Sequence, residues 1–201
     1  MGVKCFLLEP TERQRRYLRR YRGAGDHPCL VNHYHDAWVL IDVIPDKGEP
    51  ISDGRGEFEH DERWPKKCDR CDYLFTENDH YQVFLDRIYA RKDTGEEMTL
   101  RDAPPGAMWD ANWLHDLIPG MGWTGPDGRS LVAVCPGGHQ WHIDGRCSNC
   151  TRPHEPHQCW IRHGEPPNIT VDKNGNTCAA GAGSIQTPNW HGFLRDGYLV
   201  E

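Results

Sequence analysis

The chain has 201 residues, of which only 37% are hydrophobic, and a formal net charge of −7 at pH 7. The acidic charge disfavours a general nucleic-acid binder, and no apolar run approaches the roughly 20 residues that cross a bilayer. The amino terminus MGVKCFLLEP has no signal-peptide core. We therefore expect a soluble protein made in a reducing cytoplasm.

The composition predicts a loop-rich fold that needs more than an aliphatic core. The chain has 21 Gly and 15 Pro, which favour turns, and a fold short of aliphatic residues often depends on disulfides or metal ions. Nine cysteines, two C-x-x-C pairs and no secretory signal favour metal ligation by thiolates over a disulfide framework.

The first predicted element is a helix over TERQRRYLRRYR, residues 11–22. Thr11 and Gln14 form a capping box, and Gly23 stands at the C-cap position. This segment carries a charge of +5, whereas the rest of the chain carries −12. Two interpretations stay open: a surface helix docked by its aromatic stripe, or a contact face for an acidic partner. The candidate partner-binding residues are Arg13, Arg15, Arg16, Arg19, Arg20 and Arg22.

The remaining elements are predicted to be mostly strands. The apolar, β-branched stretches at 37–44 and 81–89 predict two of them, and the residues from Trp109 to Asp116 fit one short helix. Short strands follow at LVAV, WHI, ITV and YLV. The Asn-Gly and Asp-Gly pairs between or beside them favour tight hairpins.

Together these elements predict an α+β fold, predominantly antiparallel β with few short helices. We expect a zinc-ribbon-like N-terminal part and a β-rich C-terminal part. The predicted divisions are a basic N-terminal helix at 1–25, a zinc-ribbon-like subdomain at 26–92, a linker with a short helix at 93–130, and a β-rich domain with a second Cys/His cluster at 131–201.

The first candidate metal site is built around Cys68 and Cys71. A C-x-x-C turn places two thiolates on one ion, and zinc prefers four Cys or His ligands in a tetrahedral array. Cys29 with His33 or His35 completes the set, with His35 preferred.

The second candidate site is the stretch CSNCTRPHEPHQC, residues 147–159. Its predicted ligands are Cys147, Cys150, His154 and Cys159, with His157 as the alternative to His154. The spacing is one residue shorter than that of a nucleic-acid-binding zinc knuckle. Further candidates for this site are Cys135, His139, Cys178 and His191. One or two zinc ions are therefore expected.

Catalytic signals are weak by comparison. His33 and His35 form an H-x-H pair, as in some metallohydrolases, but a site with four protein ligands leaves no open position for water. His142 and Asp144 could act as a base and its orienting partner on one strand face. No phosphate-binding loop or nucleophile elbow occurs, and no catalytic residue is assigned.

The block from Asn149 to Glu201, with CPGGHQWHID before it, resembles a family of proteins from phages of actinobacteria. The HGFLRDG segment near the end is similar to a broader bacterial and phage domain of unknown function. The resemblance covers roughly residues 105–201, and 27–89 more loosely. It implies a phage origin and supplies no catalytic residue.

The sequence thus predicts a zinc-stabilised phage protein with a structural or protein-binding role, either a virion component or a factor that acts on a host protein. A homo-oligomer is compatible with this role, and nucleic acid and membrane are not expected partners. The expected location is the host cytoplasm, with incorporation in the virion as the alternative. A zinc hydrolase using His33 and His35 and a nucleic-acid-binding zinc protein are the competing hypotheses.

Overall fold

The structure is a computed structural model of the chain. It describes residues 2–23, 29, 33–48, 52–53, 55–114, 124–152, 154–155, 157–173 and 184–201. These residues form two compact units, a larger unit of Met1–Glu9 and Tyr89–Glu201 and a smaller unit of Pro10–Ile88. Strands β2 (Phe6–Arg22) and β5 (His80–Arg91) each contribute residues to both units.

The fold is nearly all β, so the predicted α+β class is wrong. In the described ranges, the one helical element with defined bounds is a single 3-10 turn, η1 (Gly56–Phe58). The predicted helix at 11–22 is part of strand β2, and Trp109 lies in strand β7 (Ala107–Asp110) instead of starting a helix. No helix in the described ranges is long and apolar enough to span a membrane.

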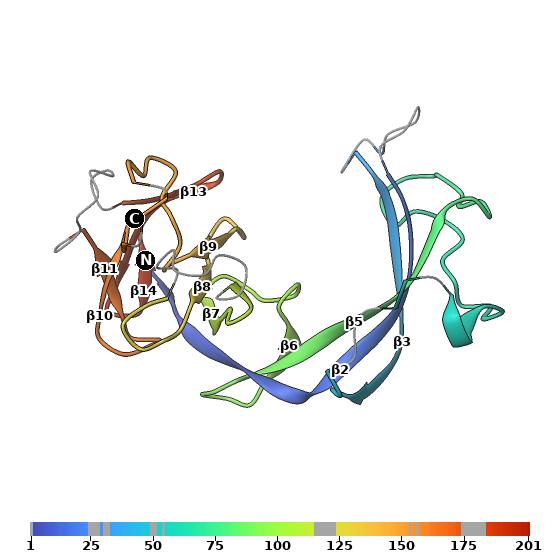
Figure 1. The fold of residues 1–201 in the computed structure, drawn as a ribbon, viewed down its shortest axis with the longest axis horizontal. Helices are drawn as coiled ribbons and strands as arrows, with labels where there is room; N and C mark the ends of the chain where they lie inside the picture. Colours follow the sequence, from blue (N-terminus) through green and yellow to red (C-terminus); the bar gives the residue numbers. More distant parts are fainter. Residues whose placement is uncertain are drawn as a thin grey trace. The chain divides into compact units, whose positions relative to one another are not determined.

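The smaller unit contains a twisted antiparallel sheet. Its strands are ordered β4 (Ser52–Asp53), β5, β2 and β3 (His35–Pro45), and β2, β3 and β5 lie side by side in Figure 1. Strands β3 and β5 confirm the predicted strands at 37–44 and 81–89. One face of this sheet packs on a core of Leu18, Trp64 and Val83.

The first residues of β2 belong to the larger unit, where they pair in parallel with β7. Strand β7 pairs with β8 (Leu131–Val134), and β8 pairs with β9 (Gln140–His142). The sequence LVAV predicts β8 at its observed bounds. Side chains of β8 alternate between two buried clusters, with Leu131 on one side and Val132 on the other. This sheet is therefore covered on both faces.

The rest of the larger unit consists of short hairpins. The strands are β1 (Val3–Lys4), β6 (Glu97–Thr99), β10 (Ile161–His163), β11 (Thr170–Asp172), β12 (Ile185–Thr187), β13 (Trp190–Arg195) and β14 (Tyr198–Val200). The chain ends meet because β1 pairs with β14 (Figure 1). The predicted Asp-Gly turn joins β13 to β14, where Asp196 and Gly197 have φ of 47° and 76°. The predicted Asn-Gly turn lies outside the described residues.

Candidate metal centres

Cys68 and Cys71 lie in a hairpin of the smaller unit. The Cys68 N–H donates to the Tyr73 carbonyl at 2.9 Å, and the Phe75 N–H donates to the Lys66 carbonyl at 3.0 Å. These bonds fold the chain back on itself around the two thiols. The same hairpin is attached to β3, because the Asp69 N–H donates to the Asp36 carbonyl at 3.0 Å.

The hairpin brings the pair against one residue of β3 and one of the segment before it. The ligand atoms of Cys29, His35, Cys68 and Cys71 all lie within 4.8 Å of one another. His35 Nδ1 is 3.2 Å from Cys71 Sγ. Tetrahedral zinc with ordinary bond lengths would separate a sulfur and a nitrogen by about 3.5 Å, so this group could hold a metal ion. It contains all four residues expected for the first site.

Burial and aromatic packing fix the orientation of His35. Its side chain is 3% exposed, and its ring stacks on Tyr73 with ring centroids 3.9 Å apart. The Tyr73 hydroxyl donates to the Asp79 carboxylate at 3.0 Å, and Asp79 also accepts the Thr76 N–H at 2.6 Å. Such outer contacts commonly orient metal ligands. His33, the alternative ligand, is exposed and lies outside the group.

The thiol of Cys68 is prepared for ionisation. Burial by itself would raise the pKa of this thiol, but hydrogen bonds from the backbone N–H groups of Asp36 and Arg70, together with the side chains of His35 and Cys71, lower the pKa to about 7. Both of these side chains belong to the same metal group as Cys68. Because metals bind the thiolate, this environment favours ligation near neutral pH.

The second group lies in the larger unit and consists of Cys150, His157 and Cys159. His157 Nε2 is 3.4 Å from Cys150 Sγ and 3.3 Å from Cys159 Sγ, again close to the separation that a tetrahedral metal requires. The group contains His157, not the preferred His154, which is exposed.

Two carbonyl contacts explain how His157 is presented. Its Nδ1 lies 2.8 Å from the Glu155 carbonyl oxygen, so Nδ1–H donates there and Nε2 is left to face the thiols. Arg146 holds the same loop, because its guanidinium donates to the carbonyls of His157 and Glu155. The sequence pattern did not indicate these contacts.

Cys147 is next to the second group and is its candidate fourth ligand. Burial raises the pKa of the Cys159 thiol, and the neighbouring Cys147 thiol raises it further. The Lys173 ammonium donates to Cys147 Sγ at 3.1 Å and to the Cys159 carbonyl at 2.8 Å. Lys173 also lies 4.0 Å from the Trp160 ring centroid. This cation balances thiolate charge at the site, a role that the sequence pattern did not indicate.

The other described cysteines belong to the hydrophobic core. Cys5 and Cys135 are buried in the larger unit, and burial raises the pKa of each thiol to about 12. They therefore stay protonated and are not available as metal ligands. All eight described cysteines are free thiols. Cys178 lies outside the described residues, and neither His139 nor His191 belongs to a metal group.

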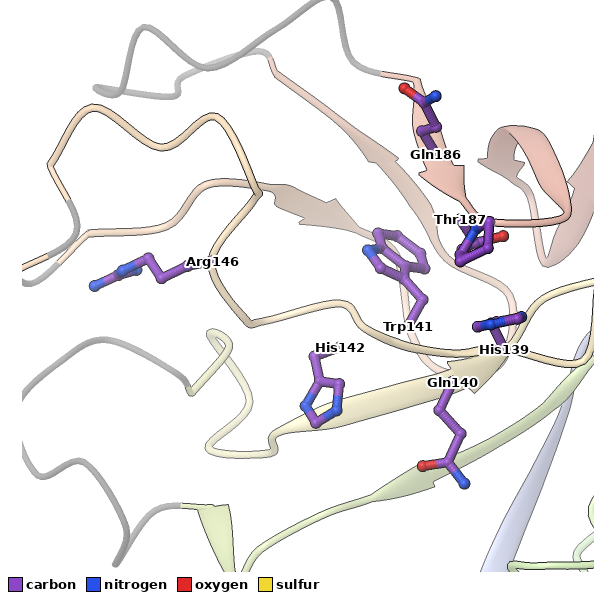
Figure 2. Close-up of a pocket in the computed structure, with 8 residues that line it drawn as sticks. His139, Gln140, Trp141, His142, Arg146, Gln186 and Thr187 are labelled. Carbon is purple, nitrogen blue, oxygen red and sulfur yellow. The ribbon is translucent and has the colours of Figure 1, made fainter. Parts of the chain in front are cut away.

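A cavity of about 330 Å³ opens beside β9 and β12 (Figure 2). Figure 2 shows Gln140 and His142 on one side of β9 and Trp141 on the other. Burial lowers the pKa of His142, which is therefore neutral at pH 7. Its proposed partner Asp144 instead binds Arg162 Nε at 2.9 Å and the Leu131 N–H at 2.7 Å. None of the described residues lining the cavity is a carboxylate or a thiol, so the cavity offers no evident acid-base pair.

No family model, curated protein or solved structure is similar enough to this chain to count as a match. The functional argument therefore depends on the residues of the chain itself.

Proposed function

We propose that this is a zinc-stabilised protein in which each unit is held together by one structural zinc ion. The observation that carries the proposal is the convergence of Cys29, His35, Cys68 and Cys71 on one point from separate parts of the chain. Four Cys and His ligands are typical of closed structural zinc sites. In the larger unit the group has three ligands, Cys150, His157 and Cys159, and Cys147 would complete a Cys3His set.

In the smaller unit, the physical reason for zinc is the small size of the core around the metal group. The core around the first group consists of Cys29, Ala37, Cys68 and Phe75, so two of its four buried residues are themselves ligands. A hairpin with so little apolar contact gains stability from a metal that crosslinks it to β3. Soft thiolates with imidazole select zinc over harder divalent cations such as magnesium.

The proposed role in biology is structural or protein-binding, as part of a phage. The likeness of the C-terminal half to actinobacteriophage proteins supports a phage origin, with a virion protein or a host factor as the partner. The zinc hydrolase hypothesis has less support, because His33 stands apart from the metal group and three thiols surround His35. A set of four protein ligands leaves no position for a reactive water.

Zinc content of the purified protein tests the proposal. Inductively coupled plasma mass spectrometry should find two zinc ions per chain, one for the Cys/His group of each unit. Cys71→Ser and Cys150→Ser should each remove one ion, and the double variant should remove both.

The matched control is Cys5→Ala, which removes a buried thiol outside both groups and should retain two zinc ions. A strong chelator should abolish the cooperative unfolding transition of the protein. The proposal would be contradicted if both serine variants retained two zinc ions per chain. It would also be contradicted if the protein stayed folded after the chelator had removed the metal.

A further inference from the structure

Because residues 11–22 form a strand, their side chains alternate between two faces of the sheet in the smaller unit. Leu18 packs in the core, and Gln14 and Arg20 are buried on the same side. The odd-numbered side chains of β2 therefore lie on the opposite face, here termed the outer face. They are Arg13, Arg15, Tyr17, Arg19 and Tyr21.

Neighbouring strands extend the outer face with aromatic rings. Trp38 of β3 lies opposite Arg19 in the register and meets Tyr17 edge-on, with ring centroids 6.0 Å apart. Phe84 of β5 meets Trp38 edge-on at 4.9 Å. At the other end of the face, Tyr21 stacks on His80 of β5 with centroids 4.9 Å apart.

The arginine in the middle of these rings is held in a fixed position. The Arg19 guanidinium is 4.5 Å from the ring centroids of both Trp38 and Tyr21. Its nitrogens donate to the Asp36 carboxylate at 2.9 Å and to the Gln82 side-chain oxygen at 3.0 Å. The outer face is therefore a pre-arranged array of flat side chains around a cation. It also has an apolar margin, because Leu40 and Val43 are 50% and 42% exposed.

The two faces differ in how arginine charge is used. On the inner face, Arg16 pairs with Asp42 and Glu57 at 2.6 and 2.7 Å, and Arg20 donates to two backbone carbonyls. Arg22 follows the same alternation and donates to the Tyr73 hydroxyl at 2.8 Å. The outer face has the other three of the six arginines of β2, Arg13, Arg15 and Arg19. The alternation of β3 and β5 places only two carboxylates there, Asp36 and Asp86. On the outer side of β2, β3 and β5, arginines therefore outnumber carboxylates, although the chain as a whole is acidic.

We propose that the outer face binds single-stranded nucleic acid. Unpaired bases stack on aromatic side chains of open antiparallel sheets, and arginines beside them contact the phosphates. On the outer face the half-buried rings of Tyr17 and Trp38 are the candidates for such stacking. A duplex should bind the outer face more weakly, because its bases are already stacked on one another and cannot stack on the rings. The inference goes beyond the structural role of zinc, and it departs from the expectation that net charge alone suggests.

Fluorescence anisotropy with the full-length, zinc-loaded protein tests the proposal. The probe is a labelled oligothymidine of about 20 nucleotides, and the comparison is its duplex with oligoadenosine. With about three phosphate contacts, the slope of log K against log salt should be about −2, so affinity should fall about 20-fold between about 50 and 200 mM salt. The duplex should bind more weakly than the single strand.

Four variants separate stacking, charge and non-specific effects. Trp38→Leu should weaken binding about tenfold, because it removes one stacking platform, and Tyr17→Leu serves as a second variant of this kind. The double variant Arg13→Gln/Arg15→Gln should reduce the salt slope to about −0.7. Arg63→Gln removes an exposed arginine that pairs with Asp61 and should change neither quantity. Zinc content and melting temperature identify variants that fold.

No binding at about 50 mM salt, or equal affinity for the duplex, would overturn the proposal. Equal losses in Arg63→Gln and the double variant would do the same, since they would indicate diffuse attraction. A second copy of the chain is the other partner that could cover the outer face. Analytical ultracentrifugation of the same samples detects it, because a dimer that dissociates in Trp38→Leu would assign this face to dimerisation instead of nucleic-acid binding.

Discussion

At the scale of the residue, the second metal group depends on a choice between two histidines three positions apart. Spacing predicts His154 as the ligand, with His157 as the alternative, and the structure places His157 in the group. Hydrogen bonds within the loop select His157. The Arg146 guanidinium donates to the carbonyls of Glu155 and His157, and the Glu155 carbonyl accepts the His157 Nδ1–H. The ligand is thus selected by backbone oxygens that no sequence motif records.

This selection gives a prediction with a matched control. His157→Ala should lower zinc content from two ions per chain to one, because it removes the imidazole that lies between two thiols. His154→Ala changes the same residue type three positions earlier and should leave zinc content unchanged. Metal analysis of the two purified variants makes the comparison, and the opposite pattern would restore the spacing-based assignment.

For the first metal group, the ligands predicted from the sequence agree with the structure. The spacing predicts that Cys68 and Cys71 share a site, since a C-x-x-C turn has few ways to arrange its thiols, and Cys29 and His35 were the expected completion. The orientation of His35 was not predictable. It depends on stacking against Tyr73, whose hydroxyl is fixed by Asp79 through a hydrogen bond.

At the scale of the element, strand β2 is the largest error of sequence-based prediction. Capping residues and arginine-rich composition favour a helix at 11–22, and local propensity is a weak constraint when tertiary contacts oppose it. The inner-face arginines of β2 have partners far along the chain: Asp42 for Arg16, and the carbonyls of Pro65 and Thr76 for Arg20. These partners exist only after the sheet has formed.

Two leucines on opposite faces of the same sheet test the strand assignment. Leu18 is fully buried and Leu40 is 50% exposed. Leu18→Ala should destabilise the protein by about 2–5 kcal/mol, because it removes buried apolar atoms and leaves a cavity. Leu40→Ala should cost within about 0.5 kcal/mol, as surface changes usually do. Urea unfolding of the zinc-loaded variants gives both free energies, and equal costs would argue against the observed alternation.

At the scale of the whole molecule, each compact unit contains its own Cys/His group. The first group lies between residues 29 and 71, within the smaller unit, and the second between 150 and 159, within the larger one. The larger unit also has the more extensive core, with fifteen buried residues in its main cluster. The smaller unit should therefore depend more strongly on its metal.

Hydrogen exchange with Cys68→Ser tests this dependence. The variant should lose amide protection in β3 and in the hairpin around residues 67–74, because the hairpin is no longer crosslinked to β3. Protection in β8 and β13 should persist, since these strands belong to the larger unit. Mass spectrometry of peptic fragments resolves the two regions. Loss of protection throughout the chain would indicate that the units unfold together.

The sequence by itself determined the features that depend on neighbouring residues. Short apolar stretches rich in β-branched residues predicted strands such as β3 and β8, the Asp-Gly pair predicted the final hairpin, and the first C-x-x-C spacing predicted that Cys68 and Cys71 share a site. Only the tertiary structure decided that residues 11–22 form a strand, that His157 replaces His154, and which arginines lie on the outer face. Each of these depends on partners distant in the chain, whose contacts outweigh local preferences of a few tenths of a kcal/mol to about 1 kcal/mol per residue.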